Sequence, residues 1–325
     1  MKAIRYYRYG AAEVLKLEDT GMPAVGDNDV LIRVKAASVN PLDWHFMRGS
    51  PYIVRPQAGL LRPKDSGLGA DMAGCVEAVG KSVTGFTPGD EVFGSPTGLG
   101  TLAEYISVPQ DNAVAAKPAN QTFEQAASVP VAAFTALQAL RDQGHLQPGH
   151  RVLVNGAAGG VGTFTVQIAR ALGAEVTGVC STGNLELVAS IGASQVIDYT
   201  RADFTRSGQR YDLLIDVAGS RPFTAYRRVL TPKGIVVGVG GPNKGRWLGP
   251  ATRAVKALLL SPFISQKVAF FLAKPGKDDL AVLSGLLASG KVTPVIDRTY
   301  PLSETPEAIR YLEQGHARGK VVITV

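Results

Sequence analysis

Cysteine is scarce, because the chain of 325 residues contains only Cys75 and Cys180. Two cysteines provide neither a disulfide framework nor a zinc site with four cysteine ligands, so we interpret both as small buried apolar residues. The first residues contain no apolar signal-peptide core. The most apolar stretch, residues 251–273, is interrupted by a proline and three basic side chains, which is unlike a membrane span. These absences predict a cytoplasmic location and no stable membrane insertion.

Charged residues make up only 19 % of the chain, and hydrophobic residues make up 45 %. This composition is globular and excludes the disordered, collagen-like and coiled-coil classes. At roughly 150 residues per domain, the length predicts two domains. The 34 Lys and Arg residues against 27 Asp and Glu leave a net charge of +7, which favours an anionic partner. Because no zinc-finger, basic-zipper or RNA-recognition signature accompanies this charge, we favour an anionic cofactor over nucleic acid.

The first third of the chain predicts short strands separated by glycine and proline turns, which is typical of a β-barrel or a sandwich. The expected strands there are residues 30–36, 74–80, 90–94 and 103–108.

From about residue 121 the pattern changes to strands that alternate with helices. Such alternation predicts βαβ units and a parallel sheet covered on both faces. The expected strands are 151–155, 175–180, 195–197, 212–217 and 234–238, and the expected helices are 123–141, 162–172 and 184–191. The last part predicts helices at 279–289 and 304–313 and strands at 292–296 and 320–324.

Glycine is abundant, with 37 residues, and the segment from Asn155 to Gly162 (NGAAGGVG) follows an expected strand and opens an expected helix. Glycines in this position let the backbone approach a pyrophosphate, and the helix N-terminus offers free N–H groups to the phosphates. The alternative is a glycine-rich turn without a ligand. The cofactor contacts predicted in this loop are Gly156, Ala158, Gly159, Gly160, Val161 and Gly162.

The residues after the second strand of this region favour NADPH over NADH. Enzymes that use NAD place an Asp or Glu there, about 20 residues after the glycines, to bind the ribose 2′-hydroxyl. This chain instead offers Ser181, Thr182 and Asn184, which are hydrogen-bond donors, and Tyr199 or Arg201 would close the pocket. The alternative is that these side chains only cap the following helix.

The segment from Gly149 to Gly162, continuing to Gln167 and Arg170, resembles the signature of quinone oxidoreductases and ζ-crystallins in the medium-chain dehydrogenase/reductase superfamily. Further similar segments occur along the whole chain, such as Leu31–Val39 and Asn40–Asp43.

The resemblance implies an α/β fold of two domains with the active site in the cleft. Residues 1–122, completed by 264–325, would form a GroES-like β-barrel catalytic domain, and residues 123–263 a Rossmann domain with a doubly wound parallel sheet. It also implies a homodimer, for which an apolar run at residues 268–273 would supply an interface strand. The implied cofactor contacts are Thr135, Tyr199, Gly240, Gly241 and Lys320, and we expect one at Ala218 as well.

Zinc-dependent relatives in this superfamily supply a cysteine, a His-Glu pair and a further cysteine or aspartate. By this resemblance the first cysteine position is Asn40, and the His-Glu position reads Ala70-Asp71. We therefore expect no catalytic zinc, which requires three protein ligands. Without a Lewis acid, alcohol oxidation is disfavoured. Hydride addition to a quinone or an activated alkene is favoured, because the conjugated carbonyl of the substrate takes up the charge.

Four residues are candidates for catalysis. Asn40 and Asp43 resemble the Asn-x-x-Asp motif of the family; Asn40 would donate a hydrogen bond, or form an Asx-turn, and Asp43 is expected to be a structural anchor. Tyr52 resembles the proton donor of related enoyl reductases, although it lies later after the loop glycine, and the alternative is a cleft-lining aromatic. His45 would shuttle a proton or form part of the wall.

Two segments, residues 44–64 and 244–277, contain basic side chains and no acidic ones. Both would border the substrate cleft by resemblance. They suggest a substrate with an anionic group or docking at an anionic membrane, and the alternative is a solvated basic face.

We predict an NADPH-dependent, zinc-independent oxidoreductase that transfers a hydride to a quinone or an α,β-unsaturated carbonyl substrate. The alternatives are an enoyl-thioester reductase and a non-catalytic NADPH-binding protein of the ζ-crystallin type, including an RNA-binding one.

Overall fold

The computed structural model describes residues 1–240 and 265–325. They form two compact units, Met1–Phe134 with Pro275–Val325, and Thr135–Lys274. These bounds differ from the expected boundaries at 122 and 263, because helix α3 (Phe123–Ala127) packs against the strands of the first unit. Helix α4 (Pro130–Gln138) begins in the first unit and ends in the second.

The first unit is built on a mostly antiparallel sheet with the strand order β14-β15-β3-β4-β5-β7, to which β6 adds by pairing with β3. Strands β1 and β2 form a separate antiparallel pair. The C-terminal strand β15 pairs with β3, so the end of the chain completes the sheet of the N-terminal part. The strands are β1 (Lys2–Arg5), β2 (Lys16–Asp19), β3 (Asp29–Val39), β4 (Asp71–Val79), β5 (Glu91–Ser95), β6 (Tyr105–Pro109), β7 (Ala113–Ala116), β14 (Ile296–Pro301) and β15 (Lys320–Thr324).

Two apolar cores hold this sheet, and β3 contributes to both because its side chains alternate between its two faces. Val30, Ile32 and Val34 lie in one core. Ala37 and Val39 lie in the other, together with residues of α1 (Pro41–Arg48) and α10 (Thr305–Glu313). This unit also contains the helices α2 (Arg55–Ala58) and α9 (Lys277–Ala288).

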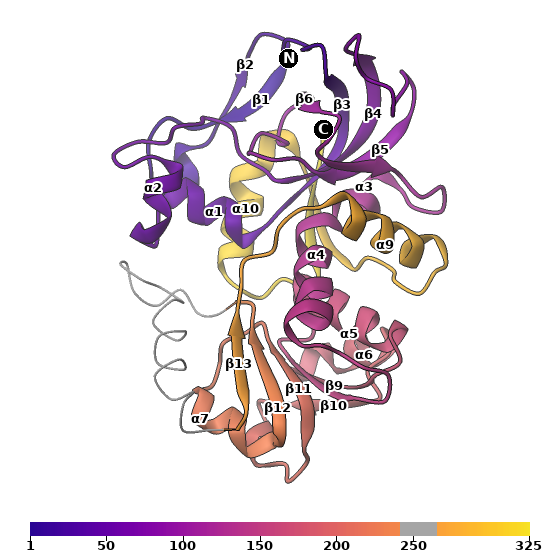
Figure 1. Cartoon of the computed structure of the whole chain (residues 1–325). Coiled ribbons are helices and arrows are strands. Elements are labelled where there is room, and N and C mark those ends of the chain that lie inside the picture. The colour runs from indigo at the N-terminus through magenta and orange to yellow at the C-terminus, as the bar shows by residue number, and fades with distance from the viewer. Residues whose placement is uncertain (241–264) are drawn as a thin grey trace. The chain divides into compact units, whose positions relative to one another are not determined.

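The second unit contains a parallel sheet with the strand order β10-β9-β8-β11-β12-β13 (Figure 1). Its first strand in sequence, β8, lies in the interior, with β9 and β10 on one side and β11, β12 and β13 on the other. The order therefore reverses between β8 and β11, and such a switch point is where doubly wound sheets bind their ligands. The elements are β8 (Arg151–Asn155), β9 (Glu175–Cys180), β10 (Gln195–Asp198), β11 (Tyr211–Asp216), β12 (Leu230–Gly238), β13 (Lys267–Phe270), α5 (Gly160–Ala171), α6 (Leu185–Ser190) and α7 (Phe223–Tyr226).

These two sheets confirm the predicted α/β class with an antiparallel and a doubly wound parallel part. The strand predicted at 292–296 is wrong: residues 292–295 are irregular, and β14 begins at Ile296. Pro294 lies in the predicted strand and has no N–H to donate to a neighbour. The single helix predicted at 123–141 is also wrong, because Ser128 and Val129 separate α3 from α4. No helix among residues 1–240 and 265–325 has the length and apolarity that a bilayer crossing requires.

Candidate functional site

The glycine-rich loop connects the carboxyl end of β8 to the N-terminus of α5, next to the switch point of the parallel sheet. The N–H groups of Gly156 and Ala157 donate to the Val179 carbonyl at 3.1 and 3.0 Å, which fixes the start of the loop against β9. The first turn of α5 leaves its N–H groups without an intrahelical carbonyl. Gly160 and Val161, in this turn, are partly exposed. The loop thus presents free donors and the positive end of the helix dipole to an anion.

The glycines of this loop serve different purposes. Gly156 has a φ of +91°, which other residues rarely adopt. A Cβ on Gly162 would lie 2.0 Å from the Gly156 carbonyl oxygen, so Gly162 is required for close packing of the helix on the loop. A Cβ on Gly159 would meet only that oxygen, at 3.7 Å, and Gly159 has an ordinary φ of −83°. The space beside Gly159 is therefore open, as a bound pyrophosphate requires.

The predicted 2′-phosphate pocket lies at the carboxyl ends of β9 and β10, which pair through Cys180 and Asp198. The Thr182 hydroxyl donates to the Asp198 carboxylate at 2.5 Å, and the Thr200 hydroxyl donates to it at 2.7 Å. These hydrogen bonds lower the pKa of Asp198. The Arg201 guanidinium lies 3.5 Å from the same carboxylate. Asp198 therefore places a carboxylate beside this pocket. The sequence analysis missed it, because a carboxylate was sought at the end of β9 and Asp198 ends β10.

Several other residues predicted to line the cofactor follow strands of this sheet. Asn184 donates to the Ser181 hydroxyl oxygen at 3.0 Å, and its own Oδ1 is buried without a partner among the described residues. Ala218 is exposed after β11, and Gly240 follows β12. Tyr199 is half exposed after β10, and Thr135 is half-buried on α4. Gly241 lies outside the described residues.

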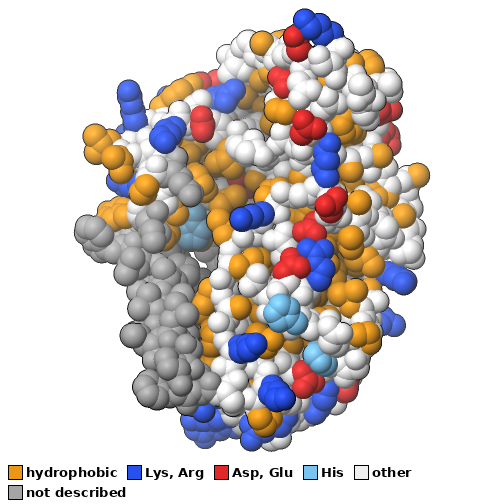
Figure 2. Space-filling model, in the orientation of Figure 1, with side chains coloured by type: hydrophobic (Ala, Val, Ile, Leu, Met, Phe, Trp, Pro, Cys, Tyr) orange, Lys and Arg blue, Asp and Glu red, His pale blue; other side chains and the backbone are white. Residues whose placement is uncertain are grey.

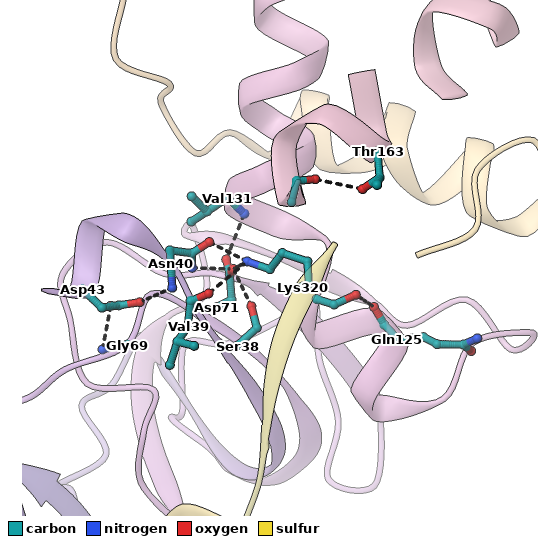
Figure 3. Close-up of polar contacts among 12 residues, drawn as sticks. Ser38, Val39, Asn40, Asp43, Gly69, Asp71, Gln125, Val131, Thr163 and Lys320 are labelled. Carbon is teal, nitrogen blue, oxygen red and sulfur yellow. Dashed lines mark hydrogen bonds and ion pairs between the residues drawn. The ribbon is translucent and has the colours of Figure 1, made fainter. Parts of the chain in front are cut away.

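In the first unit, the carboxylate of Asp71 is the centre of a buried polar cluster (Figure 3). Its Oδ2 accepts hydrogen bonds from the Ser38 hydroxyl and the Asn40 Nδ2, both at 2.8 Å, and lies 3.4 Å from the Lys320 ammonium. Its Oδ1 accepts the Val131 N–H at 2.9 Å. The strand register explains the assembly: Ser38 of β3 pairs with Asp71 of β4, and Val39 pairs with Val321 of β15. The donors therefore come from β3 and the residue directly after it, from β15 and from α4.

Lys320 was predicted to contact the cofactor, and the structure places its ammonium inside this cluster. Its side chain is 4 % exposed. Besides Asp71, it donates to the Asn40 Oδ1 at 2.5 Å and to the Val39 carbonyl at 3.5 Å.

Asp43 is the buried residue that holds the start of α1. Its carboxylate accepts the N–H of Asn40, the N-cap residue, at 2.7 Å and the N–H of Gly69 at 3.1 Å. Burial raises the pKa of Asp43 to about 7, against the lowering effect of these bonds. The contacts agree with a structural anchor. Asn40 does not cap the helix with its side chain, which is turned to Asp71 and Lys320.

His45 lies on α1, and Tyr52 lies on the short 3-10 helix Tyr52–Val54 that follows it. The His45 Nδ1 lies 2.7 Å from the Ser50 carbonyl, and because a carbonyl only accepts, this bond requires the proton on Nδ1. Burial lowers the pKa of His45, so the ring is neutral at pH 7 and stacks on Trp44. This geometry suits a wall residue better than a proton donor. The Tyr52 ring lies 4.5 Å from the guanidinium carbon of Arg55.

The structure describes all basic residues of the segment 44–64 and only some of those of the segment 244–277. Arg48 forms a bidentate ion pair with Glu313, and Arg55 stacks on Tyr9 as well as on Tyr52. Arg62 and Lys64 are exposed. In the second segment only residues 265–277 are described, so four of its basic residues lie outside the described chain. Among the described residues, no group of three or more His, Cys, Asp and Glu side chains is arranged to hold a metal ion.

Comparison with known proteins identifies the family. Residues 26–119 match the alcohol dehydrogenase GroES-like domain, and residues 191–323 match a zinc-binding dehydrogenase domain. A mitochondrial NAD(P)H oxidoreductase of Mus musculus is 38 % identical over 98 % of this chain and 87 % of its own length. The 2-methylene-furan-3-one reductase of Solanum lycopersicum is 35 % identical over 99 % of this chain and 79 % of its own. The Escherichia coli quinone oxidoreductase complexed with NADPH superimposes with a TM-score of 0.86 at 25 % identity over the whole of both chains.

These matches define an oxidoreductase that uses a nicotinamide cofactor, built from a GroES-like and a Rossmann-like part. The chain belongs to the medium-chain dehydrogenase/reductase superfamily and, within it, to the quinone oxidoreductase-like family. The resemblance noted in the sequence is therefore confirmed.

Two glycine substitutions distinguish the cofactor cradle from the packing of the loop. Gly159→Ala adds a methyl group that would meet only the Gly156 carbonyl oxygen, at an ordinary contact distance of 3.7 Å, so we expect an unchanged melting temperature and at least tenfold weaker binding of the nicotinamide cofactor. Gly162→Ala forces its methyl group against the loop backbone, so we expect a lower melting temperature. Thermal unfolding without cofactor and fluorescence titration with NADPH measure both effects. NADPH binding that Gly159→Ala leaves unchanged would contradict the assignment.

The raised pKa of Asp43 predicts that the free energy of unfolding depends on pH. Its folded-state pKa of about 7 lies above its ordinary value of 3.8, so the folded protein binds the proton more tightly. The free energy of unfolding should therefore fall as the pH rises from about 4 to about 7, by at most about 1.4 kcal/mol per pH unit from this group, and its contribution should level off above that. In Asp43→Asn this contribution is absent. Urea unfolding of both proteins across this range tests it, and parallel pH profiles would contradict it.

Proposed function

We propose that this protein is an NADPH-dependent, zinc-independent oxidoreductase that transfers a hydride to a quinone or an α,β-unsaturated carbonyl compound. The observation that carries the proposal is the glycine loop at the switch point of the parallel sheet, with free N–H donors and open space beside Gly159. The relatives named above support the same chemistry, because they include a quinone oxidoreductase complexed with NADPH and a reductase of a methylene-furanone.

When bound, NADPH would supply the hydride, and the residues of this chain would bind and orient it. The loop from Gly156 to Gly162 would hold the pyrophosphate, and Ala218 and Gly240 lie after the next two strands of the same edge. In the first unit, Asn40 and the helix that follows it would orient the substrate carbonyl. No metal ligand set is invoked, because the conjugated carbonyl of the substrate itself accepts the charge that a Lewis acid would otherwise stabilise.

The preference for NADPH rests on the edge formed by β9 and β10. Ser181 and Asn184 offer donors there, the Ser181 hydroxyl and the Asn184 Nδ2, which already donates to the Ser181 hydroxyl oxygen at 3.0 Å. The carboxylate of Asp198 is already occupied by two threonine hydroxyls. We assign the 2′-phosphate to Arg201, whose side chain is 75 % exposed beside that carboxylate.

Two alternative functions are compatible with the same fold. An enoyl-thioester reductase would use Tyr52 as its proton donor. A non-catalytic NADPH-binding protein would bind the cofactor without turnover, and an RNA-binding variant of it would need a basic surface. On the face seen in Figure 2, Lys and Arg are interspersed with Asp and Glu, which favours the enzyme over the RNA-binding protein.

A cytoplasmic location and a homodimer are further parts of the proposal. The apolar run at 268–273 begins within β13, which ends the described sheet next to β12 and offers an edge to a second copy.

The proposal predicts turnover by metal-stripped protein. Quinones, small enones, alkenals and enoyl-CoA esters are offered with NADPH, and with NADH in parallel, and cofactor oxidation is followed by absorbance. We expect turnover of quinones or enones with NADPH preferred. Turnover of the enoyl-CoA esters alone would select the enoyl-thioester reductase. Tight NADPH binding with no turnover of any compound would select the binding protein, and activity that depends on added zinc would contradict the metal-free chemistry.

A matched pair of arginine variants tests the choice of cofactor. Arg201→Ala should weaken NADPH binding about tenfold and leave NADH binding unchanged, because only NADPH carries the 2′-phosphate. Arg206→Ala is the control, since Arg206 is equally exposed at 74 % and also pairs with an aspartate three residues before it. Fluorescence titrations measure both. Equal effects of the two substitutions would remove Arg201 from the pocket, and equal affinity of the wild type for NADH and NADPH would contradict the preference itself.

A further inference from the structure

The ammonium group of Lys320 has used its hydrogen-bonding capacity inside the protein. A lysine ammonium carries three N–H donors and accepts nothing. In this structure three acceptors surround it: the Val39 carbonyl, the Asn40 Oδ1 and the Asp71 carboxylate. Because these three acceptors match its three N–H donors, none remains for a phosphate or a ribose of the cofactor.

Lys320 and Asp71 form hydrogen bonds with the two polar atoms of the Asn40 carboxamide. The Asn40 Nδ2 donates to Asp71 at 2.8 Å, and the Asn40 Oδ1 accepts from Lys320. A flipped amide would bring oxygen against the carboxylate and nitrogen against the ammonium, so only one orientation is stable. In that orientation Nδ2 keeps a second hydrogen, and no acceptor for it is found among the described residues.

We infer that Lys320 and Asp71 are positioning residues, which hold the Asn40 carboxamide so that its second Nδ2 hydrogen is available to the carbonyl oxygen of the substrate. The inference rests on the proposed function for the identity of that oxygen. It assigns Lys320 a task other than the cofactor contact that the family resemblance implies. A donor held toward an oxygen that gains negative charge during hydride transfer stabilises the transition state more than the bound substrate.

The experiment compares two variants with a control. Lys320→Met removes the ammonium, and the double variant Asp71→Asn with Lys320→Met also removes the buried charge that would otherwise be left unpaired. Lys117→Met is the control, because Lys117 is a lysine of the same unit with a side chain that is 5 % exposed, bonded to the Gln121 carbonyl and paired with Glu91. NADPH affinity is measured by fluorescence, stability by thermal unfolding, and kcat and KM with an enone.

We expect both Lys320 variants to bind NADPH within twofold of the wild type and to lose at least tenfold in kcat. The double variant leaves no unpaired buried charge, so its melting temperature should fall less than that of Lys320→Met, and an unchanged NADPH affinity shows that its loss of kcat is not a loss of fold. Lys117→Met should lower the melting temperature and leave kcat unchanged. Tenfold weaker NADPH binding with kcat retained would make Lys320 a cofactor ligand and overturn the inference.

The failure of the proposed function has a different signature. If the wild type turns over none of the substrates, that function fails, and the affinity measurement still decides the assignment of Lys320. An unchanged NADPH affinity in Lys320→Met then supports its place in the internal cluster, and a weakened affinity overturns it. Wild-type turnover with an unchanged kcat in the double variant overturns the positioning role alone.

Discussion

The buried carboxylate of Asp71 is the interaction on which the first unit depends. A carboxylate without water must be satisfied by donors, and Ser38, Asn40, Val131 and Lys320 supply them from β3, the turn after it, α4 and β15. These donors span almost the whole sequence, so the cluster forms only when the C-terminal strand has returned to β3. The arrangement thereby couples completion of the sheet to the orientation of Asn40.

In the second unit, the glycine loop offers an anion backbone N–H groups and no charged side chain. The switch in strand order beside β8 leaves room for the glycine loop, and the start of α5 adds backbone donors. Polar side chains lie at the carboxyl ends of β9 and β10. There the hydroxyls of two threonines and the Arg201 guanidinium contact the Asp198 carboxylate. Backbone N–H groups are thus placed to bind a pyrophosphate, and the proposed choice between cofactors rests on side chains.

Local sequence patterns predicted the parallel sheet well, because short apolar runs bounded by turns define its strands. The expected bounds of Arg151–Asn155 and Glu175–Cys180 in that sheet are those observed, and so are those of Lys320–Thr324 in the sheet of the first unit. The glycine loop was found for the same reason, since its signal lies within one strand, turn and helix. The prediction failed where Pro294 interrupts an apolar run, and it did not include α1, which begins at Pro41. The Asp71 cluster was out of reach, because pairing of residues 71 and 320 depends on the register of three strands.

The proposed function requires that hydride pass directly from the bound nicotinamide cofactor to the substrate without a metal. Deuterium placed in turn on each face of the nicotinamide C4 tests this requirement, using metal-stripped protein and an enone. Direct transfer places one deuterium at the β-carbon of the product, from one face only, and a solvent hydrogen at the α-carbon. A β-carbon that carries a solvent hydrogen, or deuterium transfer that begins only after zinc is added, would contradict it.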